Sequence, residues 1–144
     1  QYMAEELEKM GGIKALKSDP RITKRGYYFY LMRFNEKSFK GISRDRFIEA
    51  LSAEGVPAST AHNQPLYKNP VFVDMQFGRT GCPVRCPLYG KPIDYASVHC
   101  SVAEYAYEHE IVALRKDFLM DQKKVNLVLK AISKIKENID EILQ

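Results

Sequence analysis

The clearest pattern of hydrophobic and polar positions lies near the end of the chain. After Asp121, apolar residues recur at alternating spacings of three and four: Val125, Val128, Ile132, Ile135, Ile139 and Ile142. Such spacing gathers the apolar side chains into one stripe along a helix and leaves the lysines facing water. Asp121 is a suitable N-cap residue. The pattern predicts a long C-terminal helix that packs on a sheet.

Two earlier helices are predicted from their ends. Residues 5–10 are rich in helix-forming glutamates, and the glycine pair Gly11 and Gly12 supplies a left-handed stop. Further on, Ser43 is an N-cap residue for a helix with one apolar face, and Gly55 ends that helix. The first segment is therefore interpreted as the last turns of a helix, and the second as the most secure helix of the chain.

Three segments have the composition of β-strands. Residues 27–34 are aromatic and apolar on both faces, which predicts a buried strand, and residues 111–115 (IVALR) predict a second. Residues 56–60 predict a short strand that Pro57 confines to an edge or to its first position. The connections are too short for several parallel crossovers, so an α+β fold with a small antiparallel sheet covered by helices is expected. The length fits a single domain over 1–144.

Residues 62–100 lack clear periodicity and carry five prolines. Long irregular segments in compact domains are usually functional or linking. Directly after this segment, Ser101 and Glu104 have the S-x-x-E spacing of a capping box, which predicts a helix over 102–110.

Candidate substrate-binding residues lie at the start of the irregular segment. His62 and Asn63 follow the short strand, and Tyr67 and Lys68 come a few positions later, so polar groups gather on one loop. Arg33 is the one charged residue of the strand over 27–34. It is either a strand-end side chain that reaches solvent or a fork for an anionic substrate group. No catalytic triad, phosphate-binding glycine loop or pair of catalytic carboxylates is present in the pattern.

Charge and hydropathy exclude several classes of partner. The formal net charge is +4, but the basic residues are mixed with 18 acidic ones and form no long basic run. This pattern indicates an ordinary solvated surface and no nucleic-acid arm. The sequence contains no apolar run of membrane-spanning length and no signal-peptide core. We therefore expect a cytoplasmic protein without a membrane partner.

The three cysteines allow three interpretations. Cys82 and Cys86 stand in a proline-rich loop, and a zinc site would need them together with His99 and Cys100. Adjacent His99 and Cys100 cannot easily both reach one tetrahedral ion, and a short disulfide is unusual in a reducing compartment. Buried, inert and reduced thiols are the favoured interpretation, so no metal is expected.

Several blocks of the sequence resemble one known family. They are GYYFYLMRFNEKSFKGISRDRFIEALSAEGVPAST, then NQPLYKNPVF, the cysteine loop, CSVAEYAYEHEIVALRKDFL and the closing KAISKIKENIDEI. In this order, and over nearly the whole chain, they resemble the C-terminal small domain of DegT/DnrJ/StrS-type sugar aminotransferases. Within that family the chain is most similar to the cyclitol (inosose) aminotransferases, which carry a comparable cysteine-proline insert.

The resemblance implies a pyridoxal-phosphate enzyme of fold type I, whose whole architecture belongs to the α/β class. Its large N-terminal domain holds the cofactor and the Schiff-base lysine, and that domain is absent here, which fits a first helix that starts without a cap at Gln1. The chain alone is therefore expected to bind no cofactor and to be inactive. The intact enzyme would pass an amino group from glutamate or glutamine to a keto sugar or keto cyclitol.

The resemblance also implies a place for the candidate residues. The loop from His62 to Lys68 would lie near the substrate, with Tyr67 where most relatives have histidine. The intact enzyme would be a homodimer. The surface left by the missing domain would be apolar and would include these residues: Leu7, Met10, Tyr28, Tyr30, Phe72 and Phe77. The alternative is a stand-alone, non-catalytic binding module derived from such a domain.

Overall fold

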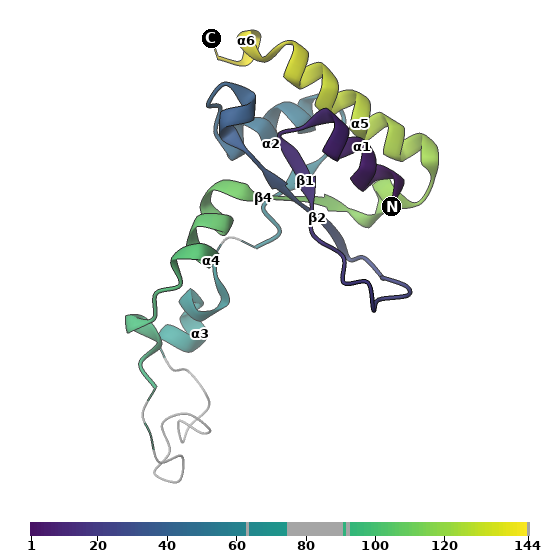
Figure 1. Cartoon of the computed structure of the whole chain (residues 1–144). Helices are drawn as coiled ribbons and strands as arrows, with labels where there is room; N and C mark the ends of the chain where they lie inside the picture. Colours follow the sequence, from purple (N-terminus) through teal and green to yellow (C-terminus); the bar gives the residue numbers. More distant parts are fainter. Residues whose placement is uncertain (63, 75–90, 92, 144) are drawn as a thin grey trace. The chain divides into compact units, whose positions relative to one another are not determined.

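The computed structural model describes residues 1–62, 64–74, 91 and 93–143. These residues form two compact units (Figure 1). The first unit consists of Gln1–Ala61 and His109–Gln144, and the second unit is His62–Glu108. The two units are described separately below.

Within the described residues, the first unit contains a four-stranded antiparallel sheet in the order β1-β2-β4-β3. Its strands are β1 (Ile13–Ala15), β2 (Phe29–Phe34), β3 (Ala58–Ser59) and β4 (Ile111–Arg115). This arrangement confirms the predicted α+β class and the edge position of the strand near Pro57. The three-residue β1 was not predicted, because a segment of that length shows no period.

The sheet buries one face more completely than the other. On β2, the side chains of Tyr30, Met32 and Phe34 are buried, and those between them are half-buried or exposed. The predicted burial of both faces is therefore wrong. Tyr28 precedes the strand and is 78% exposed, because it belongs to the loop that joins β1 to β2.

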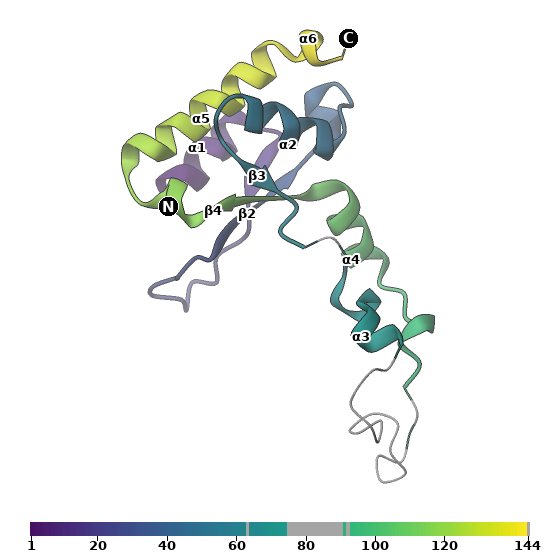
Figure 2. The same cartoon turned by 180° about the vertical axis from the view of Figure 1, so that it is seen from behind.

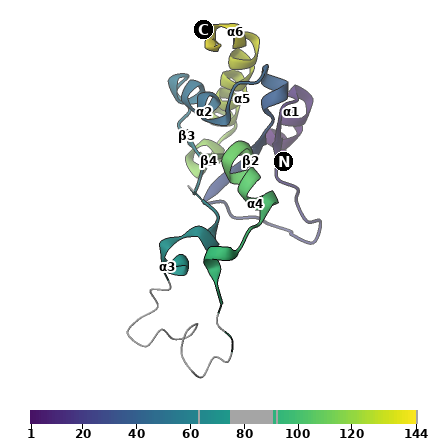
Figure 3. The same ribbon diagram turned by 90° about the vertical axis from the view of Figure 1, so that its left-hand side faces the viewer.

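Helices cover the buried face of the sheet. Figures 1 and 2 show α1 (Tyr2–Met10), α2 (Arg44–Ala53) and α5 (Gln122–Glu137) on this side, and Figure 3 shows α5 between the other two. The short α6 (Ile139–Ile142) continues from α5. The predicted apolar stripe of α5 is confirmed as part of the core, and the carboxylate of Asp121 accepts a hydrogen bond of 2.8 Å from the Lys124 N–H.

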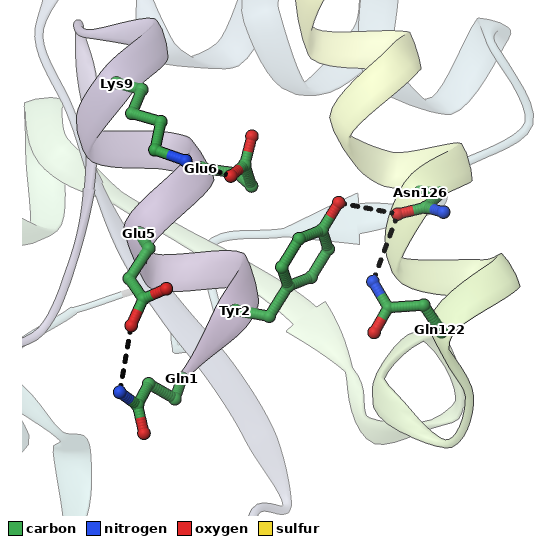
Figure 4. A network of polar contacts seen from close by, with 7 residues as sticks. All are labelled: Gln1, Tyr2, Glu5, Glu6, Lys9, Gln122 and Asn126. Atoms are coloured by element: carbon green, nitrogen blue, oxygen red, sulfur yellow. Dashed lines mark hydrogen bonds and ion pairs between the residues drawn. The ribbon is translucent and has the colours of Figure 1, made fainter.

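Polar contacts join α1 to α5 (Figure 4). Tyr2 Oη donates to Asn126 Oδ1 at 3.1 Å, and Gln122 Nε2 donates to the same oxygen at 3.2 Å. Beneath these contacts Met3 and Leu7 are buried, and Leu7 is 0% exposed.

This packing corrects the expectation of an apolar surface along the first helix. Leu7 lies in the core, Met10 packs against that core, and Tyr30 is also buried. Phe77 lies outside the described residues. Among the patch residues that the structure describes, Tyr28 alone is largely exposed. The first helix is buried because the apolar stripe of α5 packs in the same core as Met3 and Leu7 of α1.

The turn between α1 and β1 is fixed by close packing. Gly12 has φ +86°, and its carbonyl accepts a hydrogen bond of 2.9 Å from the Asn35 N–H. A Cβ atom at Gly12 would lie 2.7 Å from the Phe39 ring. Phe39 is buried and packs against Phe34 in a tilted contact and against Phe47 edge to face, with ring centroids 5.0 Å and 5.2 Å away. Glycine is therefore required here by both conformation and space.

Candidate functional site

The second unit carries most of the predicted site residues. Its described elements are the 3-10 helices η2 (Leu66–Lys68) and η3 (Tyr95–Ser97), the helices α3 (Pro70–Val73) and α4 (Ser101–Tyr105), and the π-helical turn η4 (Ala106–Glu110), which runs on toward β4. Asparagine and aspartate start two of these elements: the Asn69 side chain accepts from the Val71 N–H, and that of Asp94 from the Ala96 N–H. Proline at the first position of α3 suits this cap.

Glu104 is the centre of a polar cluster in this unit. Its Oε1 atom accepts a hydrogen bond of 2.6 Å from Tyr67 Oη and lies 3.1 Å from Lys68 Nζ. His99 Nδ1 lies 3.7 Å from the same oxygen. The hydrogen bonds from Tyr67 and then from Lys68 lower the pKa of Glu104, so it is a carboxylate at neutral pH.

Tyr67 uses both functions of its hydroxyl group. The oxygen donates to Glu104 and accepts a hydrogen bond of 3.1 Å from the Cys100 N–H. Burial of the phenol, followed by its bond to Glu104, raises the pKa of Tyr67, so the hydroxyl stays protonated. Tyr67 thereby ties η2 to the start of α4.

These contacts correct the predicted capping box. The helix begins at Ser101 with Cys100 as its cap residue, and no side chain provides the cap hydrogen bond. In the predicted box the Glu104 carboxylate would accept a hydrogen bond from the Ser101 N–H. Instead it accepts from Tyr67 Oη and lies beside Lys68 Nζ, while the Cys100 N–H donates to Tyr67 Oη. A side chain from a distant segment thus holds the carboxylate.

A cleft of about 400 Å³ lies elsewhere in the second unit. Its lining consists of His62, Gln64, Leu66, Asn69 and Tyr107. Among the residues that the structure describes, this lining carries no aspartate, glutamate, lysine or arginine, and its amide, imidazole and phenol groups can both donate and accept hydrogen bonds. Such a lining suits an uncharged, polyhydroxylated ligand better than a strongly charged one.

Arg33 lies in the first unit and has a partner. Its Nε and Nη2 atoms donate to Glu110 Oε2 and Oε1 at 2.9 Å and 2.8 Å. Hydrogen bonding to Glu110, with its negative charge, raises the pKa of Arg33 further. The pair forms because β2 and β4 place Arg33 opposite Ile111, directly beside Glu110. The guanidinium fork predicted for an anionic substrate thus holds a carboxylate of this chain.

The structure therefore places the predicted residues in three settings. Tyr67 and Lys68 meet at Glu104, whereas His62 lines the neutral cleft. Arg33 is paired in the first unit. Asn63 lies outside the described residues. Sequence reasoning placed the loop from His62 to Lys68, which contains Gln64, near the substrate, but it missed the central position of Glu104 and two cleft residues, Asn69 and Tyr107. The polar run around His62 was the signal for Gln64 and Asn69.

The cysteine loop stays untested. Cys82 and Cys86 lie outside the described residues, and Cys100 is an exposed free thiol. Among the residues that are described, no group of three or more histidine, cysteine, aspartate or glutamate side chains is placed to hold a metal ion. A search of the same residues finds no helix with the length and apolarity needed to cross a bilayer.

Comparison with known proteins identifies relatives along the whole chain. No protein-family profile matches it. Two putative L-glutamine:3-amino-2,3-dideoxy-scyllo-inosose aminotransferases are similar to it: that of Micromonospora echinospora is 29% identical over 96% of the chain, and that of Streptomyces kanamyceticus 31% over 94%. The L-glutamine:scyllo-inosose aminotransferase of Streptomyces griseus is 25% identical over 98%.

The matches cover only part of each relative. The chain spans about a third of their length, between 32% and 33% for these three proteins. The chain is thus related to L-glutamine:aminocyclitol aminotransferases across about a third of their length, which confirms its resemblance to the C-terminal domain of DegT/DnrJ/StrS-type enzymes.

Proposed function

We propose that this chain is the small domain of a pyridoxal-phosphate-dependent aminotransferase that moves an amino group from L-glutamine or glutamate to a keto cyclitol or a related keto sugar. The observation that carries the proposal is the end-to-end similarity to three aminotransferases named for such substrates. The α+β fold and the neutral cleft around His62 support it.

The cleft around His62 is proposed as the part of this chain that binds the keto cyclitol. A cyclitol presents many hydroxyl groups and no charge, so it needs donors and acceptors more than ions. Gln64, Asn69 and Tyr107 supply these groups beside His62, and Leu66 adds an apolar contact. Tyr67 and Lys68 would act indirectly, by holding the η2 segment through Glu104.

The lysines of this chain do not fit a Schiff-base site. A lysine in that role is desolvated and activated within an active site. Every lysine here is exposed or half-buried, Lys68 is paired with Glu104, and Lys136 donates to the carbonyls of Met10 and Gly11. We therefore assign the cofactor to residues outside this chain. The homodimer and the inactivity of the isolated chain belong to the same proposal.

The test begins with the coding sequence upstream of Gln1, expressed together with this chain. L-Glutamine labelled at its α-amino nitrogen is supplied with scyllo-inosose, and labelled aminocyclitol is measured. His62→Ala and Gln64→Ala should each raise the KM for the keto cyclitol about tenfold, as expected for the loss of one hydrogen bond to bound substrate. Val102→Ala, at a residue that is 83% exposed on α4, is the matched control.

Two results would contradict the proposal. One is an upstream sequence without a lysine-bearing large domain, which would favour the stand-alone binding module. The other is an active enzyme in which both cleft variants keep the KM of the parent protein. That second result would retain the aminotransferase assignment and remove the assignment of the cleft.

A further inference from the structure

A cleft of the first unit lies between α1 and the loop that joins β1 to β2. It has a volume of about 630 Å³. Binding sites for small molecules commonly measure about 300 to 1,000 Å³. Its lining comes from α1, the loop and β2, and includes these residues: Glu8, Leu16, Lys17, Arg25, Tyr27 and Phe29.

The loop over residues 16–28 is strongly basic. It contains Lys17, Arg21, Lys24 and Arg25 against a single carboxylate, that of Asp19. Arg21 forms an ion pair with this carboxylate: its Nε atom donates to Asp19 Oδ1 at 3.0 Å, and its Nη2 atom donates to Oδ2. These bonds are the main cause of the lowered pKa of Asp19, and Arg25 adds only a weaker Coulombic attraction.

Two cations are therefore left at the cleft. Arg25 is half-buried, Lys17 is exposed, and neither makes a hydrogen bond or ion pair within the described part of the chain. The carboxylate of Glu8 also lines the cleft, but its Oε1 atom lies 2.9 Å from Lys14 Nζ. A bound anion can replace the water around this guanidinium with charge-assisted hydrogen bonds.

The rest of the lining favours an organic anion over an inorganic one. Leu16 is 39% exposed and Tyr27 is 41% exposed, although both are large and apolar. Phe29 lies in the same lining, and the Tyr27 ring packs 5.4 Å from that of Tyr30, so several aromatic rings adjoin the cleft. Burying this surface under an apolar group adds binding free energy that a bare ion cannot supply.

We propose that this cleft binds an organic anion, with its phosphate or carboxylate group held by Arg25 and Lys17 and its apolar part against Leu16 and Tyr27. Phosphate and carboxylate both match the geometry of a guanidinium fork. The proposal rests on the first unit alone and does not depend on the function proposed for the second.

The experiment follows backbone amide chemical shifts of the 144-residue chain during titration. The probes are phenyl phosphate, benzoate and inorganic phosphate at constant ionic strength, with benzyl alcohol as the neutral control. Saturable shifts are expected around residues 15–18 and 25–29, strongest for one of the two aromatic anions and weaker for inorganic phosphate. Phenyl phosphate ahead of benzoate assigns a phosphate ligand, and the reverse order assigns a carboxylate ligand.

Variants separate a site from general attraction to a basic loop. Arg25→Gln should weaken binding of the preferred probe about tenfold, as expected for a charge-assisted bond. Lys17→Gln should weaken it less. Lys24→Gln removes the same charge from the same loop, but Lys24 is not among the residues that line the cleft, so binding should stay within about twofold. Equal loss in the Arg25 and Lys24 variants, or no saturation by any anion, would overturn the proposal.

Discussion

Tyr67 donates a hydrogen bond of 2.6 Å to Glu104, a residue 37 positions further along the chain. The same hydroxyl accepts the N–H of Cys100, which no side chain of its own segment caps. The Tyr67 hydroxyl thus forms hydrogen bonds both with the backbone at the start of α4 and with the Glu104 carboxylate within α4. This arrangement makes Tyr67 a structural link in the segment that also carries His62.

The first prediction concerns the removal of that hydroxyl. Tyr67→Phe keeps the ring but leaves the Cys100 N–H and the Glu104 carboxylate without their shared partner. Amide hydrogen exchange at Cys100 and along α4 should accelerate, because opening of this segment becomes easier. Tyr95→Phe is the control, since the Tyr95 ring packs on Phe72 and no hydrogen bond of its hydroxyl is found among the described residues. Equal exchange in both variants would exclude the link.

The second prediction concerns the pKa of Glu104. Its folded pKa is lowered, so its bonds stabilise the second unit above the ordinary pKa of a glutamate and this stabilisation is lost as the pH falls through the lowered value. An NMR titration of the Glu104 carboxyl carbon measures the shift directly. Tyr67→Phe should return the pKa toward normal more than Lys68→Met does, because the Tyr67 bond is the larger cause. The reverse order would contradict this assignment.

The third prediction compares two glycines with almost the same backbone conformation. Gly12 and Gly41 have φ +86° and +85°, but a Cβ atom meets Phe39 and Ser38 at Gly12 and nothing within 4 Å at Gly41. Gly41→Ala should cost about 1 to 2 kcal/mol of unfolding free energy from the left-handed conformation alone. Gly12→Ala should cost about 1 to 3 kcal/mol more, because it overpacks the aromatic core. Urea unfolding measures both, and equal losses would refute the close contact.

The fourth prediction concerns Arg33 and Glu110. The pair is bidentate, but the Arg33 side chain is 59% exposed, so solvent screens it. A double-mutant cycle with Arg33→Gln and Glu110→Gln should give a coupling of at most about 1 kcal/mol. The single-contact pair Arg46 and Glu49, at 3.3 Å, is the reference and should couple less. A coupling near zero for Arg33 would leave its fork available for another anion.

The sequence predicted elements with long periods or clear ends and missed those set by distant contacts. The helix after Asp121, the Ser43-capped helix and the strand over 111–115 were predictable because local residues specify them. The start of α4 was not, because Glu104 accepts its hydrogen bond from Tyr67, which lies 37 positions away in the sequence. The pairing of Arg33 with Glu110 depends on strand register, which the residues of β2 alone do not encode.

The second unit lies in the sequence between β3 and β4, so its length and composition can change in evolution without altering the sheet. The chain leaves the sheet after β3 and returns at β4, and these strands are antiparallel neighbours. Residues 62–108 are therefore, in topological terms, the connection of a single hairpin. The entropy of closing a loop grows only slowly with its length. Selection can lengthen, shorten or rewrite this connection to suit a new ligand, while the core under α5 keeps its sequence and its stability.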